Sequence, residues 1–332
     1  MVSGWYADVR AVGDALTGHR KTFVIFNPAS GRGRGAKRIA AYQALLAEKM
    51  PHAQWGTTTR PGQERDLADR ALESGYELIV AAGGDGTWSN VADRVVASDR
   101  EDVVFGVLPN GTGNDFGRGL GFAPADAAEA VRVLSEGHTR SVDVGRLDTT
   151  SASEHRPELL EPRHFINLIG FGFDIAVIDA AARARFLKGE LLYKVTALQQ
   201  LFRFQGVRFG IETSAGSRQD SLHLMLTVSN GRYFGGGFPI APEARIDDGL
   251  LHACLIGDAP PLGRLKLFNL AERGRHVLDP RVEIISDTEM HLTFPDPPRF
   301  EVDGDVRNAA DSSLHVRLLP GALQVVTPRV SA

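Results

Sequence analysis

The sequence has little cysteine, little net charge and no long apolar run, and each shortage excludes a class of protein. Cys254 is the one cysteine among 332 residues, so the chain forms no internal disulfide and no cysteine-cluster metal site, and a reducing cytoplasmic setting is expected. The net charge of −4 carries no electrostatic signature of nucleic-acid binding. Residues 1–20 contain no apolar core of signal-peptide length, and no stretch is apolar enough to span a bilayer. We therefore expect a chain that is soluble or peripheral to a membrane.

The ten histidines also lack a recognisable pattern. No two of them share the close spacing of metal ligands on one helix, so surface or core histidines are expected. The composition, with 43% hydrophobic and 23% charged residues, is that of a folded protein with a sizeable core.

The first half of the chain alternates short apolar runs with glycine-rich loops and helical patterns. Strand-like runs are expected at 22–26, 52–59, 76–84 and 102–109, and helical patterns at 36–49, 62–75 and 87–98. This alternation is typical of a doubly wound, parallel α/β domain. Ligands of such sheets bind at the carboxyl ends of the strands, so the glycine-rich loops 27–33, 83–87 and 108–116 should gather there.

After about residue 140 the pattern changes to short strands separated by turns. Strand-like pieces are expected at 141–147, 163–174, 207–214, 221–230, 250–258, 281–287, 290–296 and 298–305, and helical stretches at 175–204 and 261–277. This pattern favours a mainly antiparallel β-sandwich domain. We expect an α/β domain over 1–140, completed by a returning segment 311–332, and a β-rich domain over 141–310.

The second loop, Gly83–Thr87, carries a carboxylate between its glycines. Backbone N–H groups at the start of a helix bind anions, and glycines let them approach a phosphate. Asp85 would repel that phosphate unless a metal or a donor lay between them. The loop therefore predicts Asp85 as a metal-linked or basic residue beside a nucleotide, with Thr87 capping the helix, or else a simple Asx turn. The first loop alone indicates an ordinary connection as readily as an anion site.

Three motifs occur in a fixed order: "NPASG" at 27–31, "GGDGT" at 83–87 and "LPNGTGNDF" at 108–116. Together they resemble the diacylglycerol kinase catalytic-domain family, which includes bacterial lipid kinases and sphingosine and ceramide kinases. NAD kinases and phosphofructokinases resemble it in the second motif but not in the third. The resemblance continues through "SVDVGRL" with Asp143, "VSNGRYFGGGF" and "EVDGDV", and so covers nearly the whole chain beyond residue 20.

The resemblance implies ATP-dependent phosphorylation of a lipid hydroxyl, of diacylglycerol or of a sphingoid base or ceramide, with Mg²⁺ as the metal. ATP would lie in the cleft between the two domains. The residues implied to contact it are Asn27, Pro28, Ser30, Gly31, Thr59, Gly83, Gly84, Asp85, Gly86, Thr87, Thr112 and Asn114.

Phosphoryl transfer also needs a group that takes the proton of the attacking hydroxyl. In the family this is often the glutamate of Asp-Gly-Glu, and the matching residue here is Asp305, one methylene shorter. Either Asp305 or Asp85, the base in sphingosine kinases, would carry the role. Asn90 stands where the family usually has glutamate. A further magnesium site is implied at Asp248, with the main-chain oxygens of Arg245 and Leu250.

The residues that would meet the lipid are less clearly marked. The stretch 183–203 interleaves basic and apolar residues. Such a composition occurs in helices lying on an anionic membrane surface and, more often, in half-buried core helices. We expect a lipid substrate at the inner face of the membrane, peripheral membrane contact, no nucleic acid, and a possible homodimer. Two alternatives stay open: an NAD kinase-like phosphotransferase acting on a soluble hydroxyl, and a catalytically weakened nucleotide- or lipid-binding regulator.

Overall fold

The first half of the chain forms a parallel sheet covered by helices on both faces. The computed structural model describes residues 20–33, 35–111, 113–122, 126–149, 162–183 and 202–329. The parallel strands lie in the order β4 (Val104–Pro109), β3 (Leu78–Gly83), β1 (Thr22–Phe26) and β2 (Gln54–Thr57). The central strands β3 and β4 are buried along their whole length, as expected of near-continuous apolar runs covered on both faces.

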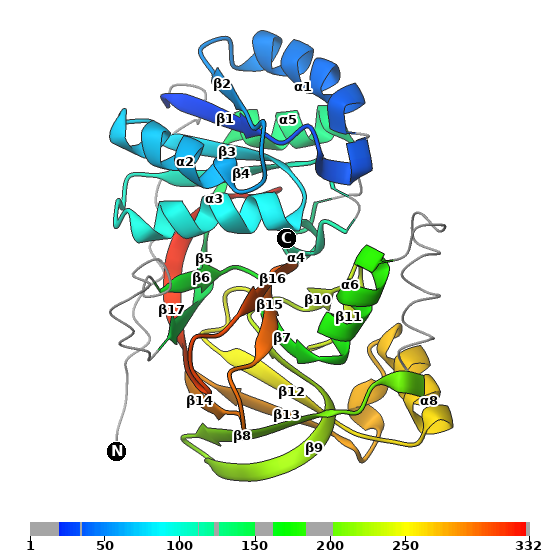
Figure 1. Cartoon of the computed structure of the whole chain (residues 1–332). Helices are drawn as coiled ribbons and strands as arrows, with labels where there is room; N and C mark the ends of the chain where they lie inside the picture. Colours follow the sequence, from blue (N-terminus) through cyan, green and yellow to red (C-terminus); the bar gives the residue numbers. More distant parts are fainter. Residues whose placement is uncertain are drawn as a thin grey trace.

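The helices divide between the two faces (Figure 1). Helices α1 (Gly35–Lys49) and α5 (Ala127–Glu136) pack on one face, whereas α2 (Gln63–Glu73) and α3 (Asp85–Ala97) pack on the other. The connection after β1 leads to the first face and the connection after β3 leads to the second. Because β1 and β3 are neighbours, a crevice for ligands is expected between these two loops.

The second half is mainly antiparallel. Its larger strands are β5 (Thr139–Thr149), β6 (Arg163–Phe165), β7 (Leu168–Gly172), β8 (Val207–Thr213), β9 (Gly216–Ser229), β12 (Leu251–Gly257), β13 (Val282–Asp287), β14 (Glu289–Thr293), β15 (Arg299–Val302) and β16 (Asp305–Asn308). Helices α6 (Phe173–Arg183) and α8 (Pro261–Ala271) lie beside them. The inward side chains of these strands form a core of their own.

Strand β17 (Ser313–Val326) joins the two halves. It pairs antiparallel with β5 and β14, and its end pairs parallel with β4 at Gln324 and Val325. Its register shifts between Leu319 and Leu323, where Gly321 has a φ of +60° that favours glycine. The strand can therefore turn from the β domain onto the parallel sheet.

The predicted fold class is confirmed, with some differences in detail. Helix α3 begins at Asp85, with Gly84 as its N-cap and no side-chain cap, so the prediction that Thr87 caps this helix is wrong. Helix α5 was not predicted. The strand expected at 163–174 is two strands, β6 and β7, and its last residues enter α6. Of the basic and apolar stretch 183–203, residues 184–201 lie outside the described residues.

Candidate active site

The three glycine-rich loops meet at the carboxyl ends of β1, β3 and β4. The side-chain amide of Asn27 donates to Thr87 Oγ1 at 3.0 Å, which joins the first loop to the second. The amide of Asn110 donates to Ser30 Oγ at 3.0 Å, which joins the third loop to the first. The expected gathering of the loops is confirmed, and Asn110 is a buried member of it that the sequence did not single out.

The second and third loops touch through glycines. A Cβ placed on Gly111 would lie 2.5 Å from Gly84 Cα and 2.8 Å from Asn114 Oδ1, so only glycine allows this approach. Asn114 is left-handed, with φ of 54°, and its side-chain amide exchanges two 3.2 Å hydrogen bonds with the backbone of Gly111. The backbone of the loops is therefore held in place by their own side chains.

Asp85 is enclosed by the third loop. Its Oδ1 accepts the Phe116 N–H at 3.1 Å. Burial, followed by the negative charges of Asp115 and Asp303, raises the pKa of Asp85 to about 7 despite that hydrogen bond. Burial also raises the pKa of Asp115, one of whose oxygens accepts Gly236 N–H from the β domain at 2.7 Å. The other oxygen, Oδ1, is buried without a hydrogen bond.

Asp305 reaches the same place from the β domain. It begins β16 after a two-residue turn in which Asp303 and Gly304 have φ of 48° and 94°, as in a tight hairpin. The Asp303 carboxylate accepts three backbone N–H groups, from Ile166, Asn167 and Leu168. This turn brings Asp305 Oδ1 to 3.4 Å from the position of a Cβ on Gly86. Asp305 thus lies beside the first turn of α3, the turn that Asp85 begins.

Asn90 stands between three charged groups. Its amide nitrogen donates to Glu64 Oε1 at 2.8 Å and to Asp305 Oδ2 at 3.1 Å, and its amide oxygen accepts from Arg163 Nη2 at 2.9 Å. Glu64 is 5% exposed, and its Oε2 is buried without a hydrogen bond. Neither Glu64 nor Arg163 belongs to a glycine-rich motif, so no sequence signal marked them.

The β domain is also clamped to α3 by charge. Arg163 and His164 of β6 both contact the buried Asp93 of α3, at 2.9 Å and 3.1 Å. Burial by itself would raise the pKa of Asp93, but the hydrogen bond from His164 and the charges of Arg163 and Arg65 hold it well below its usual range. Asp93 therefore stays ionised and fixes α3 against β6.

Models of two known protein domains match the two halves of the chain. Residues 21–147 match the model of the diacylglycerol kinase catalytic domain. Residues 167–327 match that of the YegS C-terminal NAD kinase beta sandwich-like domain. The chain thus combines a diacylglycerol kinase catalytic domain with a YegS-type C-terminal domain. Both halves of the chain, and thus both sides of the site, fall within these matches.

Curated relatives cover most of the chain. A diacylglycerol kinase of Mycobacterium tuberculosis is 28% identical over 93% of this chain and 96% of its own length. Diacylglycerol kinases of Staphylococcus epidermidis and Bacillus subtilis are 28% and 25% identical over 86% of this chain, and over 86% and 90% of their own lengths. A solved diacylglycerol kinase structure from Bacillus anthracis str. Sterne has a TM-score of 0.67 at 19% identity, covering 93% of this chain and 97% of that one. At that identity the structure supports the fold.

The carboxyl groups beside the loops fit the Mg²⁺ ion that the resemblance to diacylglycerol kinases implies. Asp85 and Asp115 are two carboxyl groups with raised pKa, and one oxygen of Asp115 has no hydrogen bond. Arg118 Nε, 3.7 Å from Asp115 Oδ1, balances part of this charge. A site made only of oxygens suits Mg²⁺, so the residues fit the ion.

The second implied metal site lies in the loop before β12. Asp248 accepts the backbone N–H of Arg245 at 2.9 Å and of Leu250 at 3.0 Å, and its Oδ2 lies 3.1 Å from His252 Nε2. The three predicted residues are therefore close together. Asp143 holds this loop in place by accepting Gly249 N–H at 2.8 Å, and it also accepts Gly321 N–H of β17.

The other residues implied to contact the nucleotide are Thr59, Pro28, Gly31 and Thr112. Thr59 is exposed after β2, where its side chain donates to Gln63 Oε1 at 3.0 Å. Pro28 and Gly31 lie in the first loop beside Asn27 and Ser30, and Gly31 has a φ of +58°. Thr112 lies outside the described residues.

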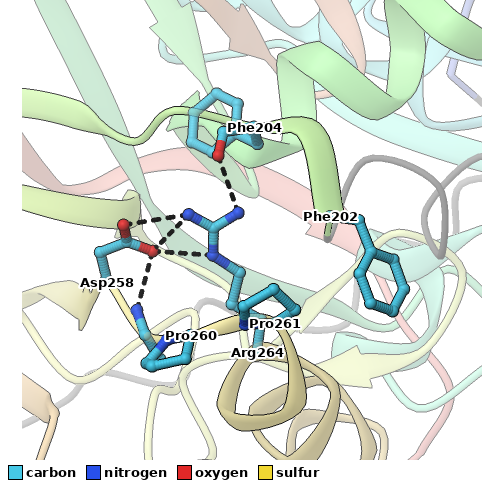
Figure 2. A pocket seen from close by; sticks show the side chains of 7 residues that line it. Phe202, Phe204, Asp258, Pro260, Pro261 and Arg264 are labelled. Atoms are coloured by element: carbon cyan, nitrogen blue, oxygen red, sulfur yellow. Dashed lines mark hydrogen bonds and ion pairs between the residues drawn. The ribbon is translucent and has the colours of Figure 1, made fainter.

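A separate pocket of about 450 Å³ lies at the start of α8, and none of its lining residues belongs to the three glycine-rich loops. Its lining combines aromatic and proline side chains with one ion pair. Figure 2 shows Arg264 donating to both oxygens of Asp258, at 2.8 Å and 3.0 Å, and to the Phe204 carbonyl at 2.7 Å. Among the described lining residues, the charges of Asp258 and Arg264 neutralise each other. Among the described residues, no helix is both long and apolar enough to cross a bilayer.

Proposed function

We propose that this chain is an ATP-dependent lipid kinase that transfers the γ-phosphate of ATP to the hydroxyl of diacylglycerol. One observation carries the proposal: Asp85 and Asp305, from different halves of the molecule, meet at the first turn of α3 beside three joined glycine-rich loops. The curated relatives that cover most of the chain are named diacylglycerol kinases, and this supports diacylglycerol as the acceptor.

The proposed roles follow the chemistry of phosphoryl transfer. Backbone N–H groups of the loops bind the phosphates of ATP, because the start of a helix and its glycines favour anions. Asp305 accepts the proton of the lipid hydroxyl, and the Asn90 amide holds that carboxylate in position. Asp85, with Asp115 beside it, would hold Mg²⁺, and the bound ion would supply positive charge against the transferred phosphoryl group.

Three further parts of the proposal concern the surroundings of the site. Asp248, with the main-chain oxygens of Arg245 and Leu250, holds a second, structural Mg²⁺. The lipid is taken from the inner face of a membrane, to which the enzyme binds peripherally from the cytoplasm. The basic and apolar composition of residues 183–203 supports this contact. A homodimer is proposed from the general frequency of dimers.

The test is transfer of labelled phosphate from ATP to a lipid. The protein is incubated with labelled ATP, Mg²⁺ and mixed micelles containing diacylglycerol, sphingosine or ceramide, and the products are identified by mass spectrometry. We expect labelled phosphatidic acid. A parallel incubation contains NAD in place of lipid, and labelled NADP formed there would support the NAD kinase alternative. No transfer to any acceptor would support the regulator.

Asp305→Asn separates the two candidate bases. The variant keeps an acceptor of the same size but does not take a proton, so turnover should fall by at least about 100-fold while ATP binding is retained. Unchanged turnover would move the role of base to Asp85.

A further inference from the structure

A cluster of two histidines and a glutamate lies on the outer face of the β domain. Glu289 and His291 are two residues apart on β14 and so share one face. The register pairs His291 directly with His315 of β17. The buried residues of the two strands, Met290 and Leu292 among them, point to the opposite side. The cluster therefore lies on the solvent side of a sheet whose inner side is core.

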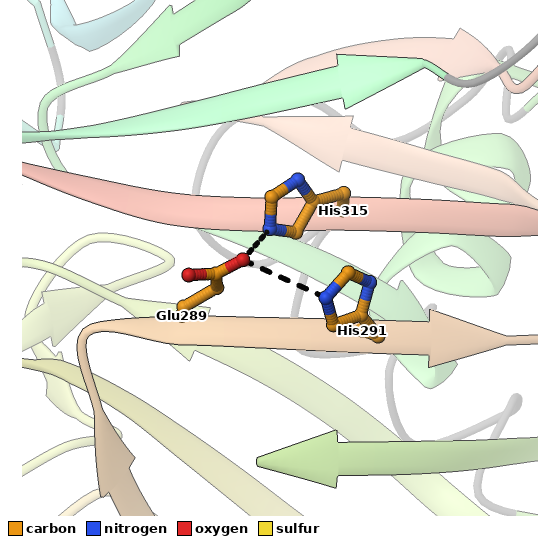
Figure 3. A group of neighbouring side chains, drawn as sticks. All are labelled: Glu289, His291 and His315. Atoms are coloured by element: carbon orange, nitrogen blue, oxygen red, sulfur yellow. Dashed lines mark hydrogen bonds and ion pairs between the residues drawn. The ribbon is translucent and has the colours of Figure 1, made fainter. Parts of the chain in front are cut away.

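The three side chains converge on one point (Figure 3). Glu289 Oε1 lies 2.6 Å from His315 Nε2 and 3.6 Å from His291 Nε2. The two imidazole rings stack at 4.3 Å with 3° between their planes. One ligand atom from each residue lies within 4.8 Å of the others. Both histidines thus present the same nitrogen to the same carboxylate oxygen.

We propose that Glu289, His291 and His315 bind one Zn²⁺ ion. Two imidazoles and a carboxylate are a set of ligands that Zn²⁺ uses, with the fourth position left to water. Metal–ligand distances of about 2.0–2.2 Å place neighbouring ligands of a tetrahedral site roughly 3.4 Å apart. The 2.6 Å and 3.6 Å separations lie on either side of that value, so small rotations of exposed side chains complete the site.

The surroundings of the cluster carry both signs of charge, because Asp148 also pairs with Arg146 at 2.7 Å and with Arg317 at 3.3 Å. Asp148 of β5 pairs with His315 in the register, and its Oδ2 lies 3.9 Å from the outer nitrogen, Nδ1, of that ring. A carboxylate behind a ligating imidazole orients the ring and strengthens its binding. On the other side, the register pairs Glu212 of β8 with His291. A row of four polar side chains, Glu212, His291, His315 and Asp148, therefore crosses four neighbouring strands.

This site differs in chemistry and in role from the proposed magnesium sites. Imidazole nitrogen favours zinc and related transition metals, whereas Mg²⁺ favours oxygen. The ion would join β14 to β17, the strand whose end pairs with β4 in the parallel sheet. We therefore assign it a role that is independent of phosphoryl transfer.

The experiment is calorimetric titration of the full chain, without a histidine tag, with ZnCl₂ in a phosphate-free buffer at pH 7.5. We expect one site in the unchanged protein. His291→Ala and His315→Ala should each weaken binding by about 100-fold, more than the loss of most outer partners costs. Glu289→Gln should weaken it as well. Because protons compete for the imidazole nitrogens, binding should weaken at pH 5.5.

His52→Ala is the matched control, because His52 is exposed in the parallel domain and far from β14 in the sequence. Its affinity for Zn²⁺ should equal that of the unchanged protein. Zn²⁺ should also raise the Tm of the unchanged protein but not that of His291→Ala. Equal Zn²⁺ binding by the unchanged protein and both histidine variants, or no binding by any of them, would overturn the proposal.

Discussion

At position 90 an amide makes contacts that a carboxylate would not make. Asn90 donates to Glu64 and to Asp305 through one nitrogen while its oxygen accepts from Arg163. A glutamate, usual in the family at this position, would keep the contact with Arg163 but face two carboxylates with like charge. The negative charge that the family carries at position 90 is thus supplied here by Glu64 of α2, to which the Asn90 amide donates a hydrogen bond. The departure from the family pattern is a relocation of charge.

This relocation predicts the behaviour of two variants. Asn90→Glu should lower kcat by about tenfold, because the new carboxylate disturbs Asp305. Adding Glu64→Gln should recover most of that loss, a coupling of the size found between contacting residues. The control adds Glu73→Gln to Asn90→Glu instead. Glu73 is exposed at the end of α2, so this change should recover none of the lost kcat. The lipid phosphorylation assay measures all four proteins; a double variant no faster than Asn90→Glu would contradict the charge relocation.

The pKa of Asp85 predicts a pH dependence. Its proposed role requires the ionised form, which becomes the major form only above a pH of about 7. In the free enzyme kcat/KM should therefore rise with pH through about 7 and level off only above it. Asp115→Asn removes the largest charge that raises this pKa and keeps an acceptor for Gly236 N–H. The rise should move to lower pH by about one unit. An unmoved profile would show that another group controls it.

Individual site residues were predictable only where a motif carried them. Asp85 and Asp305 stand in glycine-containing motifs whose chemistry can be interpreted from the sequence. Glu64 and Arg163 stand in an ordinary amphipathic helix and an ordinary short strand. They act on the site only because tertiary packing brings α2 and β6 to opposite sides of α3.

At the scale of elements, the loops depend on close backbone contact. Gly111→Ala would place a methyl group 2.5 Å from Gly84 Cα, so the second and third loops would have to separate. We expect KM for ATP to rise by at least about tenfold, since displaced donors bind phosphate poorly. Gly119→Ala is the control, because its added Cβ would meet only Ile246, at 3.7 Å. Equal KM values for the two variants would contradict a phosphate-binding role for the loops.

The elements themselves were predicted unevenly. The central strands were predictable because burial on both faces requires continuous apolar runs, as in β3 and β4. The start of α3 was not, because Thr87 has the composition of a cap but its hydroxyl instead accepts a hydrogen bond from Asn27. That bond depends on the neighbouring loop, which a local pattern does not contain.

At the scale of the whole molecule, the register of strand pairing determines which residues far apart in the sequence become neighbours. His291 and His315 are 24 positions apart in the numbering and have no helical spacing, yet antiparallel pairing of β14 with β17 places them side by side. The same holds for Asp143, whose carboxylate joins the loop at Gly249 to the bend at Gly321. Long-range pairings of this kind follow from the fold and are not written in any one segment.

Two buried carboxyl groups predict how the stability of the whole chain depends on pH. Asp174 and Glu301 both lie against Gly170, and neither oxygen of Asp174 has a hydrogen bond. Burial raises the pKa of Asp174 to about 7. Burial, followed by the charge of Asp174, raises the pKa of Glu301 well above its usual value. In the folded protein these groups therefore hold protons that the unfolded chain releases above a pH of about 4.

The folded state binds more protons than the unfolded state between pH 4 and 7, so the free energy of unfolding should fall as pH rises through this range. The slope is at most about 1.4 kcal/mol per pH unit for each such proton. Asp174→Asn removes one of these groups, and its amide can donate to Glu301. Its slope, from urea unfolding at a series of pH values above 4.5, should be shallower. Asp296→Asn, at an exposed position, should keep the original slope; a shared slope in all three proteins would mean that the buried pair does not control stability.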